Sequence, residues 1–245
     1  MRSTQLRTIA GLLLMAAVCV FGIGMMLDGM PLGLDDLVMN ATVAWRSPAV
    51  TSVVGELTLV FSPLAVTVWT ACAAAFFVIR DHAVRRAFPL VASVAAAGLI
   101  GEIIKIVVHR HRPPIADQLG TLETTYSFPS GHVTGTTAFV FALALIATTQ
   151  STRLTRIAAL SAAGLITLVA ACTRIYLGVH WVTDVVAGVC AGLAVALAVP
   201  IWAEALLRTL SRHSPDNLRR YIVQVIPQRP TSDNDRHPTM TDIRQ

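Results

Sequence analysis

A histidine and an aspartate in the last third of the sequence have the spacing of a catalytic pair. His180 and Asp184 are four residues apart, which places them on one face where a helix is predicted to begin. A carboxylate one turn away can accept a hydrogen bond from one imidazole nitrogen, so that the other nitrogen is free to attack a substrate. An ion pair that caps the helix would use the same spacing. A nucleophilic His180 oriented by Asp184 is thus one of two interpretations of this segment.

A second histidine stands at another predicted helix start, in the segment Pro129-Ser130-Gly131-His132. Serine is a good N-cap, and an apolar run follows it at once. Gly131 allows the backbone to approach a ligand closely, and the first amides of a helix lie at its positive end. We therefore expect Ser130 and Gly131 to bind a phosphate group, with His132 beside it. An ordinary capped helix with a histidine at the membrane boundary is the alternative.

Three cations could converge on the same anion. Lys105 and Arg112 are seven residues apart, or two helical turns, so they are predicted to share a helix face that ends before Pro113. Arg174 supplies a planar guanidinium suited to phosphate oxygens. Each cation alone could be a snorkelling lysine or an arginine that sets topology. The ionisable residues come from three separate segments but are predicted on one side of a membrane. Ionisable residues in membrane helices cost free energy, so their presence favours a shared site.

The elements that must position these residues are predicted to be membrane helices. Only 13% of the 245 residues are charged, against about 25% in soluble domains, and the mean hydropathy is +0.64. A bilayer core requires about 20 apolar residues per helix, and most of the charge-free runs approach that length. We predict an all-α bundle of six transmembrane helices over residues 1–207 and a polar tail over 208–245, disordered at its end. The runs cover residues 8–27, 57–79, 87–101 (extended to about 108), 133–152, 157–173 and 185–203.

The distribution of arginine predicts the orientation. Most cations fall at the N-terminus, in the second and fourth connections and in the tail, which the positive-inside rule assigns to the cytoplasm. Both termini are therefore expected in the cytoplasm and the candidate site at the outer face. The basic residues lie between apolar blocks and form no stripe for nucleic acid. The connection over residues 28–56 is expected to be an interfacial amphipathic helix or a plain loop.

Three motifs together resemble the signatures of the type 2 phosphatidic acid phosphatase superfamily. The resemblance covers residues 105 to 184, and the six-helix frame is also similar. Thr173 stands where the family usually has serine, and threonine retains the hydroxyl. The three motifs are Lys105-x6-Arg112-Pro113, Pro129-Ser130-Gly131-His132 and Arg174-x5-His180-x3-Asp184.

The resemblance implies a role for each site residue. His180 would be the nucleophile that forms a phosphohistidine, Asp184 would orient it, and His132 would protonate the leaving oxygen. No metal or cofactor is implied, and the sequence shows no cluster of carboxylates that would hold a metal. The residues implied to bind the phosphate and stabilise its charge are Lys105, Arg112, Ser130, Gly131 and Arg174.

The sequence thus predicts an integral plasma-membrane lipid phosphatase that acts on a lipid phosphate of the outer leaflet. A polyprenyl diphosphate is slightly favoured as substrate, and phosphatidylglycerophosphate and phosphatidic acid stay open. The same intermediate could also pass its phosphate to a sugar or lipid acceptor. A vanadate-dependent haloperoxidase shares this anion site, but six spanning helices argue against it. A non-catalytic transporter or scaffold is the third class, although transporters usually place polar groups at the membrane midplane.

Four nearby residues are given non-catalytic roles. Glu102 lies one turn before Lys105 and is expected to pair with it. His109, Arg110 and His111 are expected to anchor the chain at the membrane interface.

Overall fold

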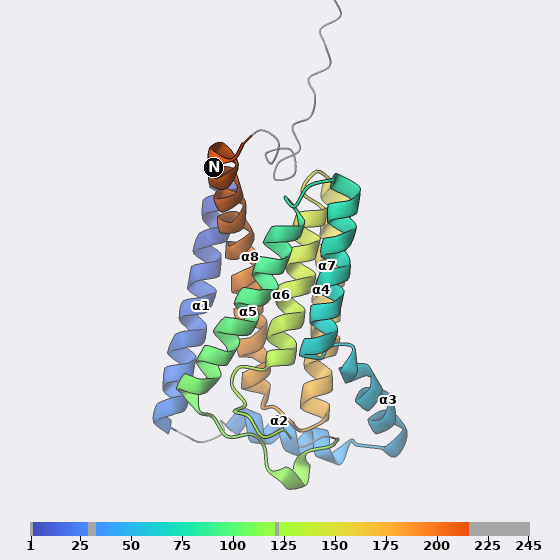
Figure 1. The fold of residues 1–245 in the computed structure, drawn as a ribbon. Helices are drawn as coiled ribbons and strands as arrows, with labels where there is room; N and C mark the ends of the chain where they lie inside the picture. The colour runs from blue at the N-terminus through green and yellow to red at the C-terminus, as the bar shows by residue number, and fades with distance from the viewer. Residues whose placement is uncertain (1, 29–32, 121–122, 216–245) are drawn as a thin grey trace, which may run out of the picture.

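The computed structural model describes residues 2–28, 33–120 and 123–215, and this part of the chain is a bundle of helices without a strand (Figure 1). The all-α prediction is therefore confirmed. In chain order the elements are α1 (Arg2–Asp28), α2 (Gly33–Ala44), α3 (Pro48–Leu59), α4 (Pro63–Asp81), α5 (Ala87–Val108), the 3-10 turn η1 (Ile115–Asp117), α6 (Gly131–Ala147), α7 (Arg153–Tyr176) and α8 (Val182–His213).

Five of these helices, α1, α4, α5, α7 and α8, are long and apolar enough to cross a membrane. The apolar helix α6 has 17 residues and is shorter, and it packs against α5, α7 and α8. Together they make the six helices that the apolar runs predict, in the predicted order. The chain is an integral membrane protein.

The connection predicted over residues 28–56 contains two helices, α2 and α3, in its described part. Figure 1 shows α2 running across one end of the bundle, where it contacts α7 and α8. The apolar run over residues 57–79 also proved to be divided. Ser62 caps α4 by accepting a hydrogen bond from Ala65 N at 3.2 Å, and Pro63 occupies the first turn. Because proline is favoured at a helix start, the run is cut there although it carries no charge.

The ends of two helices differ from the spacing argument. His109 adopts a left-handed conformation with a φ of 52° and ends α5 after Val108. The predicted end near residue 108 is confirmed, but Arg112 lies beyond the helix, so the expectation that it shares a helix face with Lys105 is wrong. His180 likewise precedes α8, which begins at Val182.

Glycine brings α6 and α8 into close contact beside the predicted site. A side chain at Gly192 would place its Cβ 2.6 Å from the Thr137 Cβ, which is too close for any residue but glycine. One turn along, a Cβ at Gly188 would lie 3.0 Å from the Ser130 carbonyl oxygen. This packing brings the first turn of α8 against the start of α6, where Ser130 N donates a hydrogen bond to Asp184 O at 3.1 Å.

The start of α1 and the end of α8 lie together at the end of the bundle opposite α2 (Figure 1). The helix α8 continues to His213, so the first residues of the tail predicted over 208–245 are helical. The predicted disorder at the end of the tail lies outside the described residues.

Candidate active site

The predicted site residues gather at the α2 end of the bundle, although they come from three separate segments. Lys105 lies in the last turn of α5, Ser130 caps α6, and His180 lies between α7 and α8. The side chain of His180 is 1% exposed, which is unusual for a group able to carry charge. A buried imidazole surrounded by cations has the character of a reaction centre more than of a surface anchor.

Hydrogen bonding assigns the tautomer of His180. Its Nε2 lies 3.2 Å from Arg112 Nη1, and because a guanidinium can only donate, Nε2 must accept. The ring proton is therefore assigned to Nδ1. Nδ1 faces Asp184 Oδ2 at 3.6 Å, which is within ion-pair range but longer than a hydrogen bond. Asp184 thus faces the proton-bearing nitrogen, and a shift of a few tenths of an ångström would close the hydrogen bond.

The surroundings of His180 keep it neutral. Burial lowers its pKa well below the ordinary value of 6.5, and the nearby charges of Arg112 and Arg174 lower it further. A neutral imidazole retains the lone pair that a nucleophile requires.

One carboxylate bridges the two arginines of the site. Glu123 Oε2 lies 3.0 Å from Arg112 Nη2, while its Oε1 accepts a short hydrogen bond from Arg174 Nη2. Burial alone would raise the pKa of Glu123, but Arg174 and Arg112 together lower it below its ordinary value, so the bridging group is an anion. Two guanidinium groups from distant segments therefore converge on one anion beside His180.

Backbone and side-chain acceptors hold the arginines in place. Arg112 donates from Nε to Thr125 O at 2.6 Å and from Nη1 to Val179 O at 2.7 Å. Arg174 donates from Nη1 to the hydroxyl of Thr58, on α3, at 3.1 Å. The two guanidinium planes are thus fixed before any substrate binds, so less conformational entropy is lost on binding.

The start of α6 completes the anion site. The Ser130 hydroxyl is buried but has no hydrogen-bond partner among the described residues, although Ser130 is the N-cap. A Cβ built on Gly131 would lie 3.3 Å from Lys105 Nζ, so the glycine leaves room for the ammonium group. Lys105 Nζ also pairs with Glu102 Oε1 at 2.9 Å, as predicted. A buried, unpaired hydroxyl and the free amides of a helix start fit a bound phosphate.

His132 is the second residue of α6 and is half-buried. It is near enough to Arg174, Glu123 and His180 to interact with them electrostatically. The structure therefore brings all eight predicted residues to one end of the bundle: His180, His132, Asp184, Lys105, Arg112, Ser130, Gly131 and Arg174.

The prediction for Arg110 as an interfacial anchor is wrong. Its side chain is 5% exposed and lies between two carboxylates, 2.6 Å from Asp35 Oδ2 and 2.5 Å from Asp184 Oδ1. The neighbouring His109 and His111 are exposed. Sequence reasoning overlooked Asp35, Thr58 and Glu123 as well. Their signal was weak, because the partners of these polar residues among the site arginines come from other segments of the chain.

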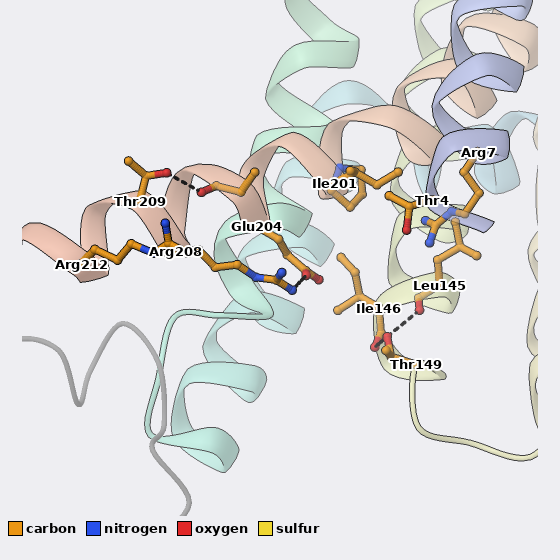
Figure 2. Close-up of a pocket in the computed structure, with 12 residues that line it drawn as sticks. Thr4, Arg7, Leu145, Ile146, Thr149, Ile201, Glu204, Arg208, Thr209 and Arg212 are labelled. Atoms are coloured by element: carbon orange, nitrogen blue, oxygen red, sulfur yellow. Dashed lines mark hydrogen bonds and ion pairs between the residues drawn. The ribbon is translucent and has the colours of Figure 1, made fainter. Parts of the chain in front are cut away.

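Among the residues that the structure describes, no group of three or more histidine, cysteine or acidic side chains is arranged to hold a metal ion. A polar pocket of about 490 Å³ does lie at the opposite end of the bundle (Figure 2). Its lining includes Arg7, Glu204, Arg208 and Arg212, and none of the predicted site residues. Among the described residues that line it there is no histidine or cysteine.

Comparisons with known proteins identify the family of the chain. The model of the PAP2 superfamily matches residues 86–208, a stretch that contains all eight predicted site residues. No curated protein matches the chain. Two solved structures are similar. The first is a transmembrane PAP2-type phosphatidylglycerolphosphate phosphatase from Bacillus subtilis, with 21% identity and a TM-score of 0.68 over 78% of this chain and 96% of that one. The second is Aquifex aeolicus LpxE, with 22% identity and a TM-score of 0.48 over 68% of this chain and 92% of that one.

The first similarity shows that the two chains share a fold. The family match spans about half of the chain, and Thr58 of α3 lies outside it. The chain therefore belongs to the PAP2 superfamily.

Proposed function

We propose that this enzyme hydrolyses the phosphate or diphosphate monoester of a lipid through a phosphohistidine on His180. The observation that carries the proposal is the carboxylate of Glu123, held between Arg112 and Arg174 beside a buried neutral imidazole. A phosphate group has the charge and the several acceptor oxygens to take the place of that carboxylate. Its phosphorus atom would then be within reach of His180 Nε2.

In the first step, Nε2 of His180 attacks phosphorus while the bond from phosphorus to the lipid oxygen breaks. His132 donates its proton to that oxygen, and the Nδ1–H group of His180 donates a hydrogen bond to Asp184. The charge that develops on the phosphoryl oxygens is the largest barrier in such a transfer. The groups proposed to stabilise it are the cations Lys105, Arg112 and Arg174, the Ser130 hydroxyl and the backbone amide of Gly131.

In the second step, a water molecule takes the place of the lipid product. His132 now accepts a proton from the water, whose oxygen attacks phosphorus as the nitrogen–phosphorus bond breaks. Inorganic phosphate leaves, and His180 returns to its neutral form. Because cations surround the phosphate position, we propose that the reaction needs no metal. Activity should survive EDTA and be inhibited by vanadate, and a loss on chelation that magnesium restores would contradict this.

We favour a polyprenyl diphosphate as substrate, because the arginine-rich and alanine-rich composition with short loops suits bacterial cell-envelope recycling. Phosphatidylglycerophosphate, the kind of lipid for which the Bacillus subtilis phosphatase is named, and phosphatidic acid are the other candidates. The experiment is to measure inorganic phosphate released by the purified protein from all three lipids. Equal rates on all three would contradict the preference, and no release from any would contradict the function.

The two histidines can be separated with two substrates. The leaving group of a lipid monophosphate is an alkoxide, which needs a proton. The leaving group of p-nitrophenyl phosphate is a phenolate, which is stable without one. His132→Ala should lose about 10²–10⁴-fold in kcat/KM on the lipid and recover in part on the second substrate. His180→Ala should be inactive on both. Recovery of His180→Ala alone would show that the two roles are exchanged.

We also propose that the site faces the outside of the cell and that both termini face the cytoplasm. In support, the start of α1 and the end of α8 lie at the end opposite the site (Figure 1). The connections after α4 and α6 lie at that same opposite end. Five arginines lie in these connections or in the adjoining helix turns: Arg80, Arg85, Arg86, Arg153 and Arg156. A reporter fused to the C-terminus should behave as cytoplasmic. A periplasmic signal from that fusion would reverse the orientation.

A further inference from the structure

Two charged residues lie buried next to the proposed catalytic pair but take no part in the proposed chemistry. Arg110 follows α5 and is 6% exposed, and Asp35 lies in the first turn of α2 and is 1% exposed. Arg110 donates from Nη2 to Asp35 Oδ2 at 2.6 Å and from Nη1 to Asp184 Oδ1 at 2.5 Å. One guanidinium thus joins an aspartate of α2 to the aspartate that faces His180.

A threonine makes a second connection between the same groups. Thr183 donates to Asp35 Oδ1 from its backbone N at 3.0 Å and from its hydroxyl at 2.9 Å. The same hydroxyl accepts from Arg110 Nη1 at 2.6 Å. Because Thr183 precedes Asp184 in the first turn of α8, Asp35 holds both the helix start and the guanidinium.

This cluster fixes both oxygens of Asp184. Oδ1 is held by Arg110, and Oδ2 accepts from Trp181 N at 2.9 Å. With both oxygens tied, the carboxylate cannot rotate, and Oδ2 remains directed at His180 Nδ1. Buried ion pairs contribute little net stability compared with apolar residues of the same volume. The benefit of this cluster is therefore its geometry.

We propose that Asp35 and Arg110 are positioning residues of the reaction: Asp35 holds Arg110, and Arg110 holds Asp184 in the orientation that controls the His180 tautomer. The proposal rests on the proposed function. It links α2, a helix with none of the family motifs, to the nucleophile. Neither residue touches the phosphate position, so they should affect the rate of the chemical step and leave anion binding unchanged.

The test is Asp35→Asn, which keeps the shape and the hydrogen-bond acceptor but removes the charge that holds Arg110. We expect kcat to fall about 10–100-fold, the size of effect found when a hydrogen-bond partner that orients an active-site group is lost. KM and the inhibition constant of vanadate should change less than about twofold, since Lys105, Arg112 and Arg174 are untouched. Asp36→Asn is the matched control: this aspartate is next in the same turn but is exposed, and its replacement should leave kcat unchanged.

A double-mutant cycle distinguishes positioning from a structural role. If Asp35 acts through Asp184, then Asp35→Asn added to Asp184→Asn should lower kcat no further. A full multiplicative loss in that background, or an equal rise of KM and of the vanadate constant, would overturn the proposal. If Asp35→Asn does not fold, Thr183→Val removes only the bridging hydroxyl and is tested in the same cycle. His180→Ala remains the separate test of the function, since activity without His180 would refute the function itself.

Discussion

Arg110 and Arg112 are two residues apart, yet they lie in different electrostatic settings. Arg110 is enclosed with two carboxylates, Asp35 and Asp184, whose side chains are both 0% exposed. Arg112 shares one carboxylate with Arg174, and that group, Glu123, is 28% exposed. We call the first set the closed cluster (Arg110, Asp35, Asp184) and the second the open cluster (Arg112, Arg174, Glu123).

The anion that faces a buried arginine decides what that arginine can do. A buried cation must be offset by an anion, because desolvation of an unpaired charge is costly. In the closed cluster the anions are side chains of α2 and α8, which cannot leave without unpacking the helices. In the open cluster the anion comes from the connection between α5 and α6, so a phosphate can take its place. The first arrangement suits positioning, and the second suits binding.

The largest expected effect is a loss of protein stability when the closed cluster is broken. Arg110→Gln leaves two buried carboxylates without their cation, which should lower the free energy of unfolding by about 3–5 kcal/mol. Arg112→Gln leaves Glu123 with Arg174 and partial access to water, so it should cost clearly less. Thermal unfolding of both variants in detergent measures the difference. Equal losses would show that the two clusters are not distinct.

The next effect is on catalysis by the open cluster. Arg174→Gln should lower kcat/KM about 10²–10³-fold, because one donor to the transferring phosphoryl group is lost. Vanadate inhibition should weaken along with it, in contrast to Asp35→Asn. Steady-state kinetics with and without vanadate would check both. Unchanged vanadate affinity in Arg174→Gln would place this arginine with the positioning residues.

A smaller and opposite effect is expected at Glu123. If its carboxylate occupies the phosphate position, Glu123→Gln should strengthen vanadate inhibition by about tenfold, since an anionic competitor is removed. Glu56→Gln, on α3, is the control and should leave the inhibition constant unchanged. Weaker inhibition in Glu123→Gln would mean that Glu123 supports the anion site and does not compete for it.

The pH dependence should reflect the open cluster around His180. Because burial and the two arginines lower the pKa of His180, it stays neutral as the pH falls below 6.5 and is protonated only at more acid pH. In a plot of kcat/KM against pH, the fall in activity on the acid side (the acid limb) should therefore lie below pH 6.5. Glu123 works against this shift, so Glu123→Gln should not move the limb to higher pH. A limb at or above pH 6.5 in the wild type would contradict a neutral nucleophile.

The smallest effect is expected at the other end of the bundle. Arg208 pairs with Glu204 at 3.2 Å in the pocket of Figure 2, and the two side chains are 66% and 39% exposed. Exposed ion pairs of this kind contribute little to stability. Arg208→Gln should therefore change neither the melting temperature nor kcat/KM by a measurable amount. A loss of activity would show that this end of the bundle is coupled to the site.

The helical frame can be predicted from the sequence, and so can a set of candidate site residues. Long charge-free runs must be satisfied as helices in lipid, so six helices could be predicted in order. The serine-glycine segment predicted the start of α6 at Gly131. Conversely, the run over residues 57–79 predicts a single helix, because hydropathy alone does not register the break that Ser62 and Pro63 introduce.

The tertiary structure alone decided how the charges are shared. The spacing of Lys105 and Arg112 predicts one helix face, but α5 ends at Val108 and Arg112 lies in the connection that follows. Arg110 could not be told from an interfacial arginine, because its partners lie 75 and 74 residues away. A side chain's role as anchor, binder or positioning residue depends on which carboxylates surround it and how deeply they are buried. Those distances are set when helices pack, and no local pattern of residues encodes them.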